Sequence, residues 1–214
     1  SILPMFAWIK LESFMNFEEI KKILSEKTVG IAGAGGLGSN CAVALARVGI
    51  GNLVICDFDI VSESNLNRQF YFYRQIGHKK AFSIEENIQL VNPRVKVTAL
   101  DIKLDRHNVE QIFQKCDIIV EAFDLAEMKE MLLETILEKL PDIPVVTGLG
   151  MAGWGDSNSL KVKKIGNLYI CGDERSEIAE DLPPLAPRVG IVANMQANTV
   201  LEIILNGHSN ENYT

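Results

Sequence analysis

The glycines near the start of the chain are spaced so that they could hold a phosphate. Residues 28–39 read T-V-G-I-A-G-A-G-G-L-G-S, a short apolar strand that runs into G-x-G-x-x-G. Gly33 allows a tight turn, Gly35 lets the backbone approach a phosphate, and Gly38 lets the next helix pack close to the strand. The first turn of that helix offers unpaired N–H groups and a positive dipole end to an anion. The motif therefore predicts where the phosphates of a nucleotide bind.

Two acids stand where a nucleotide's ribose is expected. Asp57 and Asp59 directly follow a second apolar strand at residues 52–56, and an acid there can accept hydrogen bonds from ribose hydroxyls. Strand, glycine turn, helix, strand and acid, in this order, form the mononucleotide-binding half of a doubly wound sheet. The alternative is a glycine turn that packs tightly without a ligand. We favour the bound nucleotide because the acid stands in its expected place.

A basic stretch follows the acids. Residues 65–84 hold Arg68, Arg74, Lys79 and Lys80 and no acidic residue, in a chain whose formal net charge is −7. Backbone amides can largely neutralise the diphosphate of a dinucleotide, whereas a triphosphate needs arginine and lysine. The stretch therefore favours a nucleoside triphosphate. The alternative is a solvated basic face.

Asp124 is a candidate magnesium ligand. It lies just past a predicted buried strand at residues 117–122, and ligands of parallel α/β sheets collect beyond the carboxyl ends of strands. Magnesium prefers one or two carboxylates together with phosphate oxygens and water. The alternative is that Asp124 caps the helix that follows.

Alternating helices and strands predict the fold that positions these residues. Apolar periodicity and capping residues predict helices at 16–26, 79–91, 108–115 and 127–140, and a helix that the glycine turn opens and that runs through 42–46 to residue 48. They predict strands from residue 28 and at 52–56, 95–100, 117–122 and 143–147. Alternation of this kind implies parallel pairing with right-handed crossovers. We therefore predict an α/β fold with a Rossmann-like, doubly wound and mostly parallel sheet.

The pattern changes after residue 150. Strands at 160–165 and 168–171, joined by Gly166–Asn167, predict a hairpin, so that parallel order gives way to antiparallel strands. Residues 172–187 predict a loop, and a closing helix at 190–205 is expected to end at Asn206–Gly207. We predict an N-terminal arm and helix at 1–27, a single nucleotide-binding domain at 28–207, and a tail at 208–214.

Composition narrows the classes of function. The chain has 214 residues and 47% hydrophobic content, which excludes general disorder, and its negative charge argues against nucleic acid or an anionic membrane as the main partner. No apolar run reaches membrane-spanning length. The apolar start I-L-P-M-F-A-W-I lacks the flanking signals of a secretion leader, so we expect an arm that packs on the domain or a second subunit. The four cysteines are Cys41, Cys56, Cys116 and Cys171, whose wide spacing predicts reduced, buried thiols in a cytoplasmic protein.

Several longer motifs accompany the glycine turn. They are G-A-G-G-L-G-S at 33–39, G-N-L-V-I-C-D-F-D at 51–59, S-E-S-N-L-N-R-Q-F at 62–70, G-H-K-K at 77–80 and N-P at 92–93. Together with Asp124 they resemble the ThiF–MoeB–HesA family, bacterial relatives of ubiquitin-activating enzymes. The N-L-x-R-Q element is much more specific than the glycine turn, and the resemblance covers roughly residues 28–205.

The resemblance implies ATP-dependent adenylation, with Mg²⁺, of the C-terminal glycine carboxylate of a small ubiquitin-like sulfur carrier ending in Gly-Gly. It implies a homodimer, and the chain looks closest to short ThiF-type proteins of thiamine biosynthesis. Catalytic roles are implied for Arg68, Lys80 and Asp124, the last of these as the magnesium ligand. The implied ATP-binding residues are Gly33, Gly35, Gly36, Gly38, Asp57 at the ribose, Asn65, Arg68, Gln69 and Lys80.

The chain also departs from this family. It lacks the two C-x-x-C pairs that hold zinc in many relatives, so we expect no zinc site, and we interpret Cys171 as a structural strand thiol. Relatives commonly use an N-terminal arginine at the ATP, and here Lys10 substitutes or the contact is missing. Alternative functions are an ATP-dependent enzyme acting on a molybdopterin-type carrier, a modified tRNA or a small-molecule carboxylate, a nicotinamide-dependent oxidoreductase, and a non-catalytic nucleotide sensor.

Overall fold

The computed structural model describes residues 15–211. Most of the predicted arm, including Lys10, and residues 212–214 lie outside the described residues. The strands are β1 (Thr28–Ala32), β2 (Asn52–Cys56), β3 (Lys96–Leu100), β4 (Ile118–Glu121), β5 (Val145–Gly148), β6 (Lys161–Ile165) and β7 (Leu168–Gly172). The helices are α1 (Phe17–Ser25), α2 (Gly36–Val48), α3 (Lys80–Val91), α4 (Val109–Phe113), α5 (Ala126–Lys139) and α6 (Ala186–Glu211).

All seven strands form one sheet in the order β3-β2-β1-β4-β5-β7-β6. Every neighbouring pair is parallel except β6 with β7, so the prediction of a doubly wound, mostly parallel sheet is confirmed. The chain winds outward in both directions from β1 and β4, which are neighbours. This junction is the topological switch point, where open α/β sheets bind their ligands.

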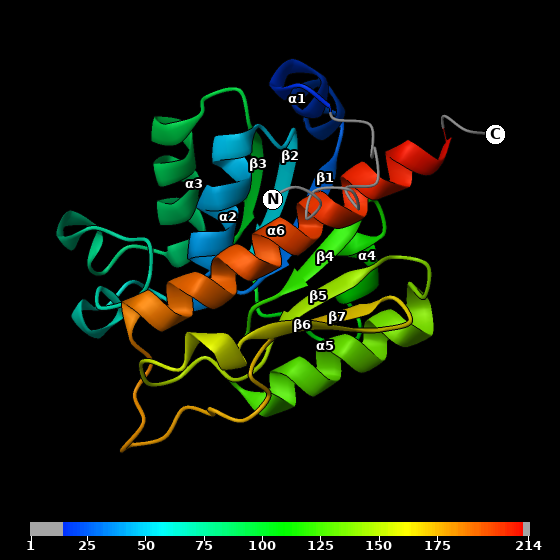
Figure 1. The fold of residues 1–214 in the computed structure, drawn as a ribbon. Helices are drawn as coiled ribbons and strands as arrows, with labels where there is room; N and C mark the ends of the chain where they lie inside the picture. The colour runs from blue at the N-terminus through cyan, green and yellow to red at the C-terminus, as the bar shows by residue number, and fades with distance from the viewer. Residues whose placement is uncertain (1–14, 212–214) are drawn as a thin grey trace, which may run out of the picture.

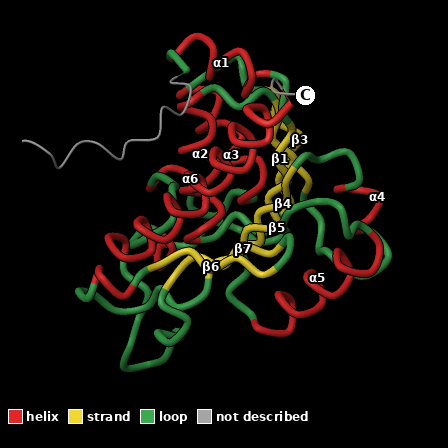
Figure 2. Tube along the Cα trace, turned by 45° about the vertical axis from the view of Figure 1, so that its right-hand side comes forward, coloured by secondary structure: helices red, strands yellow, loops and turns green. Residues whose placement is uncertain are grey.

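Helices cover both faces of the sheet (Figures 1 and 2). On the face covered by α2, α3 and α6, Ile31 and Val120 belong to one buried apolar cluster. Their sequence neighbours Ala32 and Ile119 point to the other face, where they pack with Phe113 and other residues of α4 and α5. Side chains alternate between the faces of a strand, so strands buried on both faces, such as β1 and β4, supply both cores.

Helix α1 begins as the sequence predicts. Asn16 caps it, and the capping box with Glu19 is complete, since each side chain accepts a backbone N–H of the other residue. Helix α2 ends at Gly49, which adopts φ +92°. That left-handed conformation favours glycine and closes the helix. The other predicted elements are present with small shifts at their ends.

The predicted antiparallel end of the sheet is confirmed, since β6 pairs antiparallel with β7, while β7 pairs in parallel with β5. The predicted bounds of the closing helix need correction. Helix α6 begins at Ala186 and runs to Glu211, past Asn206–Gly207. Proline is tolerated in a first turn, where its missing N–H has no partner, and one glycine inside a helix costs only about 1 kcal/mol. Residues 208–211 therefore belong to the helix and not to a tail. Within the described part of the chain, no helix is both long and apolar enough to cross a membrane.

Candidate active site

The glycine turn packs as its residue types require. Gly33 adopts φ +96°, and a Cβ there would lie 2.9 Å from the carbonyl oxygen of Ala122. A Cβ on Gly38 would lie 1.8 Å from the carbonyl oxygen of Gly33, so only glycine allows α2 to approach β1 this closely. Gly35 differs, since the nearest atom to its Cβ position is Gln69 Nε2 at 3.8 Å. Its free side faces a cavity.

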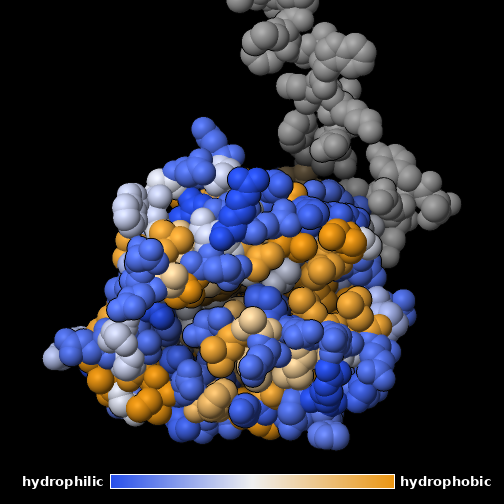
Figure 3. Space-filling view, turned by 90° about the horizontal axis from the view of Figure 1, so that it is seen from below, coloured by the Kyte–Doolittle hydropathy of each residue, from blue (hydrophilic) through white to orange (hydrophobic). Residues whose placement is uncertain are grey.

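This cavity, of about 260 Å³, lies beyond the carboxyl ends of β1, β2 and β4. Seen from below, this edge of the molecule is hollowed between hydrophilic and hydrophobic side chains (Figure 3). The predicted site residues that line it are Gly33, Gly35, Gly36, Asp57, Arg68, Gln69, Lys80 and Asp124. The structure therefore brings together groups that are far apart in the sequence. Gly38 and Asn65 do not line the cavity.

Asp57 is fixed against the glycine turn. Its Oδ2 accepts the Ala34 N–H at 2.7 Å, and its Oδ1 accepts the Asp59 N–H at 2.8 Å. Burial raises the pKa of Asp57, although the Ala34 N–H and the charge of Lys80 oppose this shift. A carboxylate has about four lone-pair sites, so Asp57 retains acceptor capacity for ribose hydroxyls.

Lys80 is a buried cation at the same cavity. Its side chain is only 8% exposed, and its Nζ lies 2.9 Å from Asp59 Oδ2. The sequence analysis missed Asp59 as its partner, although the D-x-D spacing could have indicated that one acid faces the ribose and the other a cation. The pair holds the ammonium group at the cavity wall. A phosphate bound there would replace the Asp59 carboxylate as the partner of Lys80, or would share the ammonium group with it.

A short 3₁₀ turn at residues 63–65 presents Arg68. The Asn65 carbonyl accepts the N–H groups of Arg68 and Gln69, and its Oδ1 accepts the Ser62 N–H at 3.0 Å. Asn65 thus shapes the turn, and its contact with a nucleotide stays a prediction. Arg68 covers Gly36, since a Cβ there would lie 3.5 Å from Arg68 Cγ.

Gln69 leaves an acceptor available at the cavity. The residue is 8% exposed, and its Oε1 is buried without a hydrogen-bond partner in the described structure. Phe70, which follows it, donates its N–H to Ser39 Oγ of α2 at 2.9 Å. This bond ties the turn to the helix that carries the phosphate-binding glycines.

Asp124 is exposed and lines the cavity. Leu125, not Asp124, is the N-cap residue of α5, and no side chain caps this helix. The capping alternative is therefore excluded. Asp124 has no side-chain partner among the described residues, so its carboxylate is free to bind a cation.

A buried network that the sequence analysis missed supports the loop of Asp124. Glu121 is fully buried and binds Lys129 Nζ and Thr147 Oγ1, while its Oε1 accepts the Phe123 N–H at 2.7 Å. Lys129 also donates to the Gly148 carbonyl at 2.9 Å. The network joins the ends of β4 and β5 to α5. A glutamate inside an apolar strand, followed by lysine eight positions on, was the available signal.

The cysteines have a structural role. All four are buried free thiols, and Cys171 on β7 lies 3.7 Å from Thr199 Oγ1. Burial raises the pKa of Cys171 to about 11 and that of Cys56 to about 12, which opposes nucleophilic reactivity. Among the side chains that the structure describes, no three of His, Cys, Asp or Glu gather as a metal site would require.

Comparison with known proteins identifies the family of the chain. Residues 9–214 match the ThiF family, so the chain belongs to that family, as the motifs indicated. It is 29% identical over 197 residues to the adenylyltransferase and sulfurtransferase UBA4 of Vanderwaltozyma polyspora, covering 89% of this chain and 45% of UBA4. It is 30% identical over 190 residues to MOCS3 of Caenorhabditis briggsae, covering 86% of this chain and 47% of MOCS3. The chain spans about half the length of these relatives.

Solved structures share the fold. The E. coli tRNA N6-threonylcarbamoyladenosine dehydratase TcdA, in complex with AMP, superposes with a TM-score of 0.81 at 22% identity, covering 89% of this chain and 90% of TcdA. E. coli MccB, in complex with AMPCPP and MccA, superposes with a TM-score of 0.68 at 21% identity, covering 86% of this chain and 57% of MccB.

Proposed function

We propose that this protein adenylates, with ATP and Mg²⁺, the C-terminal glycine of a small ubiquitin-like sulfur carrier. The observation that carries the proposal is the single cavity that unites Gly35 at the start of α2, Asp57, Arg68, Lys80 and Asp124. A helix N-terminus and two cations suit a polyphosphate, and the acid beside the glycine turn suits a ribose. Membership of the ThiF family supports the same chemistry.

The cavity fits ATP in two further respects. Gly35 leaves open the space that any larger side chain would take from a phosphate, and the unpartnered Oε1 of Gln69 offers a buried acceptor. Asp124, exposed and without a partner in the described structure, fits a magnesium ion that takes its other ligands from phosphates and water. Bound Mg²⁺ would supply charge neutralisation between the phosphates.

The residues of the site suit an attack between two anions. The acceptor carboxylate would attack the α-phosphorus, and pyrophosphate would leave. Arg68 and Lys80 would reduce the repulsion between the reactants and stabilise charge that builds on the phosphate oxygens. No protein nucleophile or general base is needed, so positioning contributes most of the remaining acceleration. The raised pKa of every cysteine is consistent with this.

The acceptor is inferred from the relatives. UBA4 and MOCS3 carry the name adenylyltransferase and sulfurtransferase, which supports a sulfur carrier ending in Gly-Gly, and we place the reaction in thiamine biosynthesis because of the chain's ThiF-type motifs. TcdA, named as a tRNA-modifying dehydratase, supports the competing acceptor, a modified tRNA. The net charge of −7 favours the protein carrier. We also propose a homodimer without zinc.

Exchange of labelled pyrophosphate into ATP tests the function. We expect exchange that requires Mg²⁺ and a carrier ending in Gly-Gly, and none with a carrier that lacks its terminal glycine. Matched reactions with modified tRNA and with NAD(H) test the alternatives. Exchange without any carrier, or turnover of NAD(H), would overturn the proposal. Light scattering at micromolar concentration tests the dimer, and elemental analysis tests the absence of zinc.

A further inference from the structure

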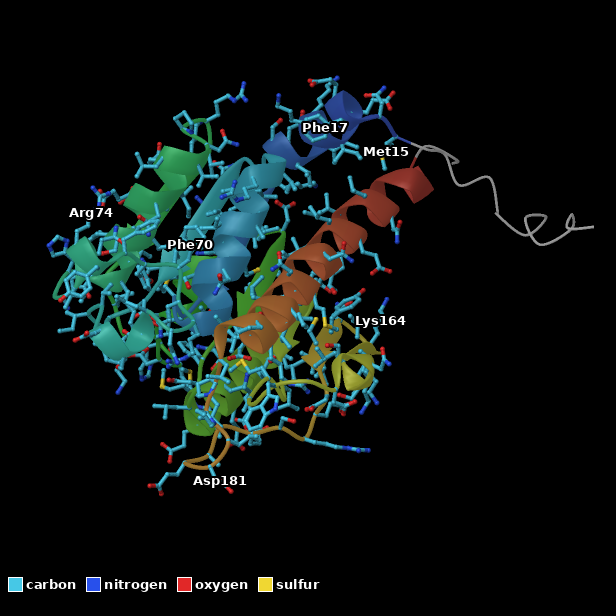
Figure 4. The ribbon with its side chains drawn as sticks, turned by 60° about the vertical axis from the view of Figure 1, so that its left-hand side comes forward. Met15, Phe17, Phe70, Arg74, Lys164 and Asp181 are labelled. Carbon is cyan, nitrogen blue, oxygen red and sulfur yellow. The ribbon has the colours of Figure 1, made fainter. Side chains whose placement is uncertain are left out.

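The segment between β7 and α6, residues 173–185, forms part of the cavity wall. Ile178 and Pro184 from this segment line the cavity together with Met151. The segment hangs below the sheet in Figure 1, and Figure 4 places Asp181 at its lower tip, directed away from the body of the molecule. Its residues contain no helix or strand, so contacts at its ends must hold it against the cavity.

A buried ion pair joins the two ends of the segment. Arg188, in the first turn of α6, places NH2 2.6 Å from Oδ2 of Asp173, which directly follows β7. The two side chains are only 4% and 6% exposed. Burying two charges is costly unless their geometry is good and their remaining donors and acceptors are used.

Asp173 organises the beginning of the segment. Its Oδ1 accepts the N–H groups of Arg175 and Ser176, both at 2.8 Å, and its Oδ2 accepts the Ser176 hydroxyl. Burial alone would raise the pKa of Asp173, but these hydrogen bonds and the one from Arg188 outweigh it and lower the pKa to about 2. The carboxylate is thus charged at neutral pH, and both of its oxygens accept hydrogen bonds.

Arg188 reaches a second loop with NH1, whereas its Nε is buried without a hydrogen-bond partner in the described structure. NH1 donates to the carbonyls of Gly155 and Asp156, in the loop that follows β5. That loop bonds in turn to the segment, since the Gly153 N–H donates to the Pro183 carbonyl at 2.9 Å and the Met151 N–H to the Ser176 carbonyl at 3.1 Å. One guanidinium group therefore fixes three pieces of chain, and only its fork geometry serves all of them at once.

We propose that the Arg188–Asp173 pair positions residues 173–185 on the cavity and thereby sets the binding of the acceptor tail. This proposal rests on the proposed function. The polar groups suited to ATP come from other parts of the chain, the glycine turn, residues 57–80 and Asp124. The segment supplies only Ile178 and Pro184, apolar contacts that suit an extended glycine tail. Arg188 is a positioning residue, and its replacement weakens binding of the acceptor tail more than binding of ATP.

The test compares Arg188→Lys with Asp173→Asn and a control. Lys163→Ala removes an exposed pair with Glu174, at 2.9 Å in the same turn, and leaves the buried pair intact. We expect the KM for the carrier to rise about ten- to a hundredfold in the two buried-pair variants, with ATP affinity by calorimetry within about twofold of the parent. Hydrogen exchange should accelerate in residues 173–185. The control should match the parent in all three measurements.

Distinct results overturn the positioning role and the proposed function. The positioning role is overturned if hydrogen exchange in residues 173–185 is unchanged in the variants. It is also overturned if the affinity for ATP falls by as large a factor as the KM for the carrier rises. A parent enzyme that binds ATP but shows no carrier-dependent pyrophosphate exchange overturns the proposed function and the acceptor part of this proposal. Hydrogen exchange still decides whether the pair holds the segment. Folding of both variants is checked by far-ultraviolet circular dichroism, and Arg188→Gln replaces Arg188→Lys if the latter does not fold.

Discussion

Two neighbouring lysines differ in where their charges lie. Lys80 is 8% exposed at the cavity, whereas Lys79 is 43% exposed and pairs with Asp101 at 3.1 Å, outside the cavity lining. Lys80→Ala removes a preorganised donor from the phosphate site, so we expect kcat/KM for pyrophosphate exchange to fall by the equivalent of about 2–4 kcal/mol. Lys79→Ala is the matched control and should remain near the parent rate. An equal fall of kcat/KM in both variants would show that the phosphates do not bind at Lys80.

Asp124 provides a test of the metal. Its carboxylate has no partner in the described structure, so Asp124→Asn should leave the midpoint of thermal unfolding nearly unchanged. The same variant should lose magnesium-dependent exchange, because it removes the carboxylate from the cavity. Glu127, another exposed acid three positions on and outside the cavity lining, supplies the control Glu127→Gln. Magnesium titrations of the exchange rate compare the variants, and full activity in Asp124→Asn would contradict the assignment.

Most of the site could be predicted at the level of single residues. Glycine spacing and the acid after the second strand predicted residues that the structure brings to one cavity, because backbone sterics leave few alternatives at Gly33 and Gly38. Asn65 could not be placed, since its type suits both a ligand contact and a turn, and only the fold shows that it bonds to Ser62. The Arg188–Asp173 pair was also missed, because its two residues stand fifteen positions apart, one after β7 and one in the first turn of α6, and no sequence period links them.

At the scale of elements, the hydrogen bonds of Glu121 and Lys129 connect β4, β5 and α5. Removing one partner of a buried ion pair leaves an uncompensated charge, so Lys129→Met should lower the free energy of unfolding by about 3–5 kcal/mol. Lys139→Met on the same helix removes a partly exposed lysine whose Nζ lies 4.0 Å from Glu110 and donates to the Arg106 carbonyl at 2.9 Å, and it should cost less than about 1 kcal/mol. Urea denaturation of both variants measures the difference. A cost for Lys129→Met as small as that for the control would show that these hydrogen bonds do not stabilise the fold.

The elements themselves followed from periodicity and capping. Strand β2 has the predicted bounds, because apolar residues end there at an acid, and α1 is fixed by its capping box. The pairing of β7 could not be predicted from a hairpin signal alone. That signal identifies the partner β6 but not the second neighbour, which depends on where the chain re-enters the sheet. The end of α6 was misjudged because Asn-Gly suits both a helix end and an exposed helical turn.

At the scale of the whole molecule, the class of nucleotide that binds can be tested by its effect on the Tm of the protein. A ligand that binds only the folded state stabilises it by about 2.7 kcal/mol at a hundred times its Kd, which corresponds to a rise in Tm of about 5–10 °C for a chain of this size. We expect ATP with Mg²⁺ to produce such a rise and NAD(H) none, because the cavity holds Arg68 and Lys80 for a polyphosphate. Differential scanning fluorimetry of the parent and Lys80→Ala measures it. The variant should show a smaller rise with ATP, and a rise with NAD(H) alone would favour the oxidoreductase reading and contradict the proposed function.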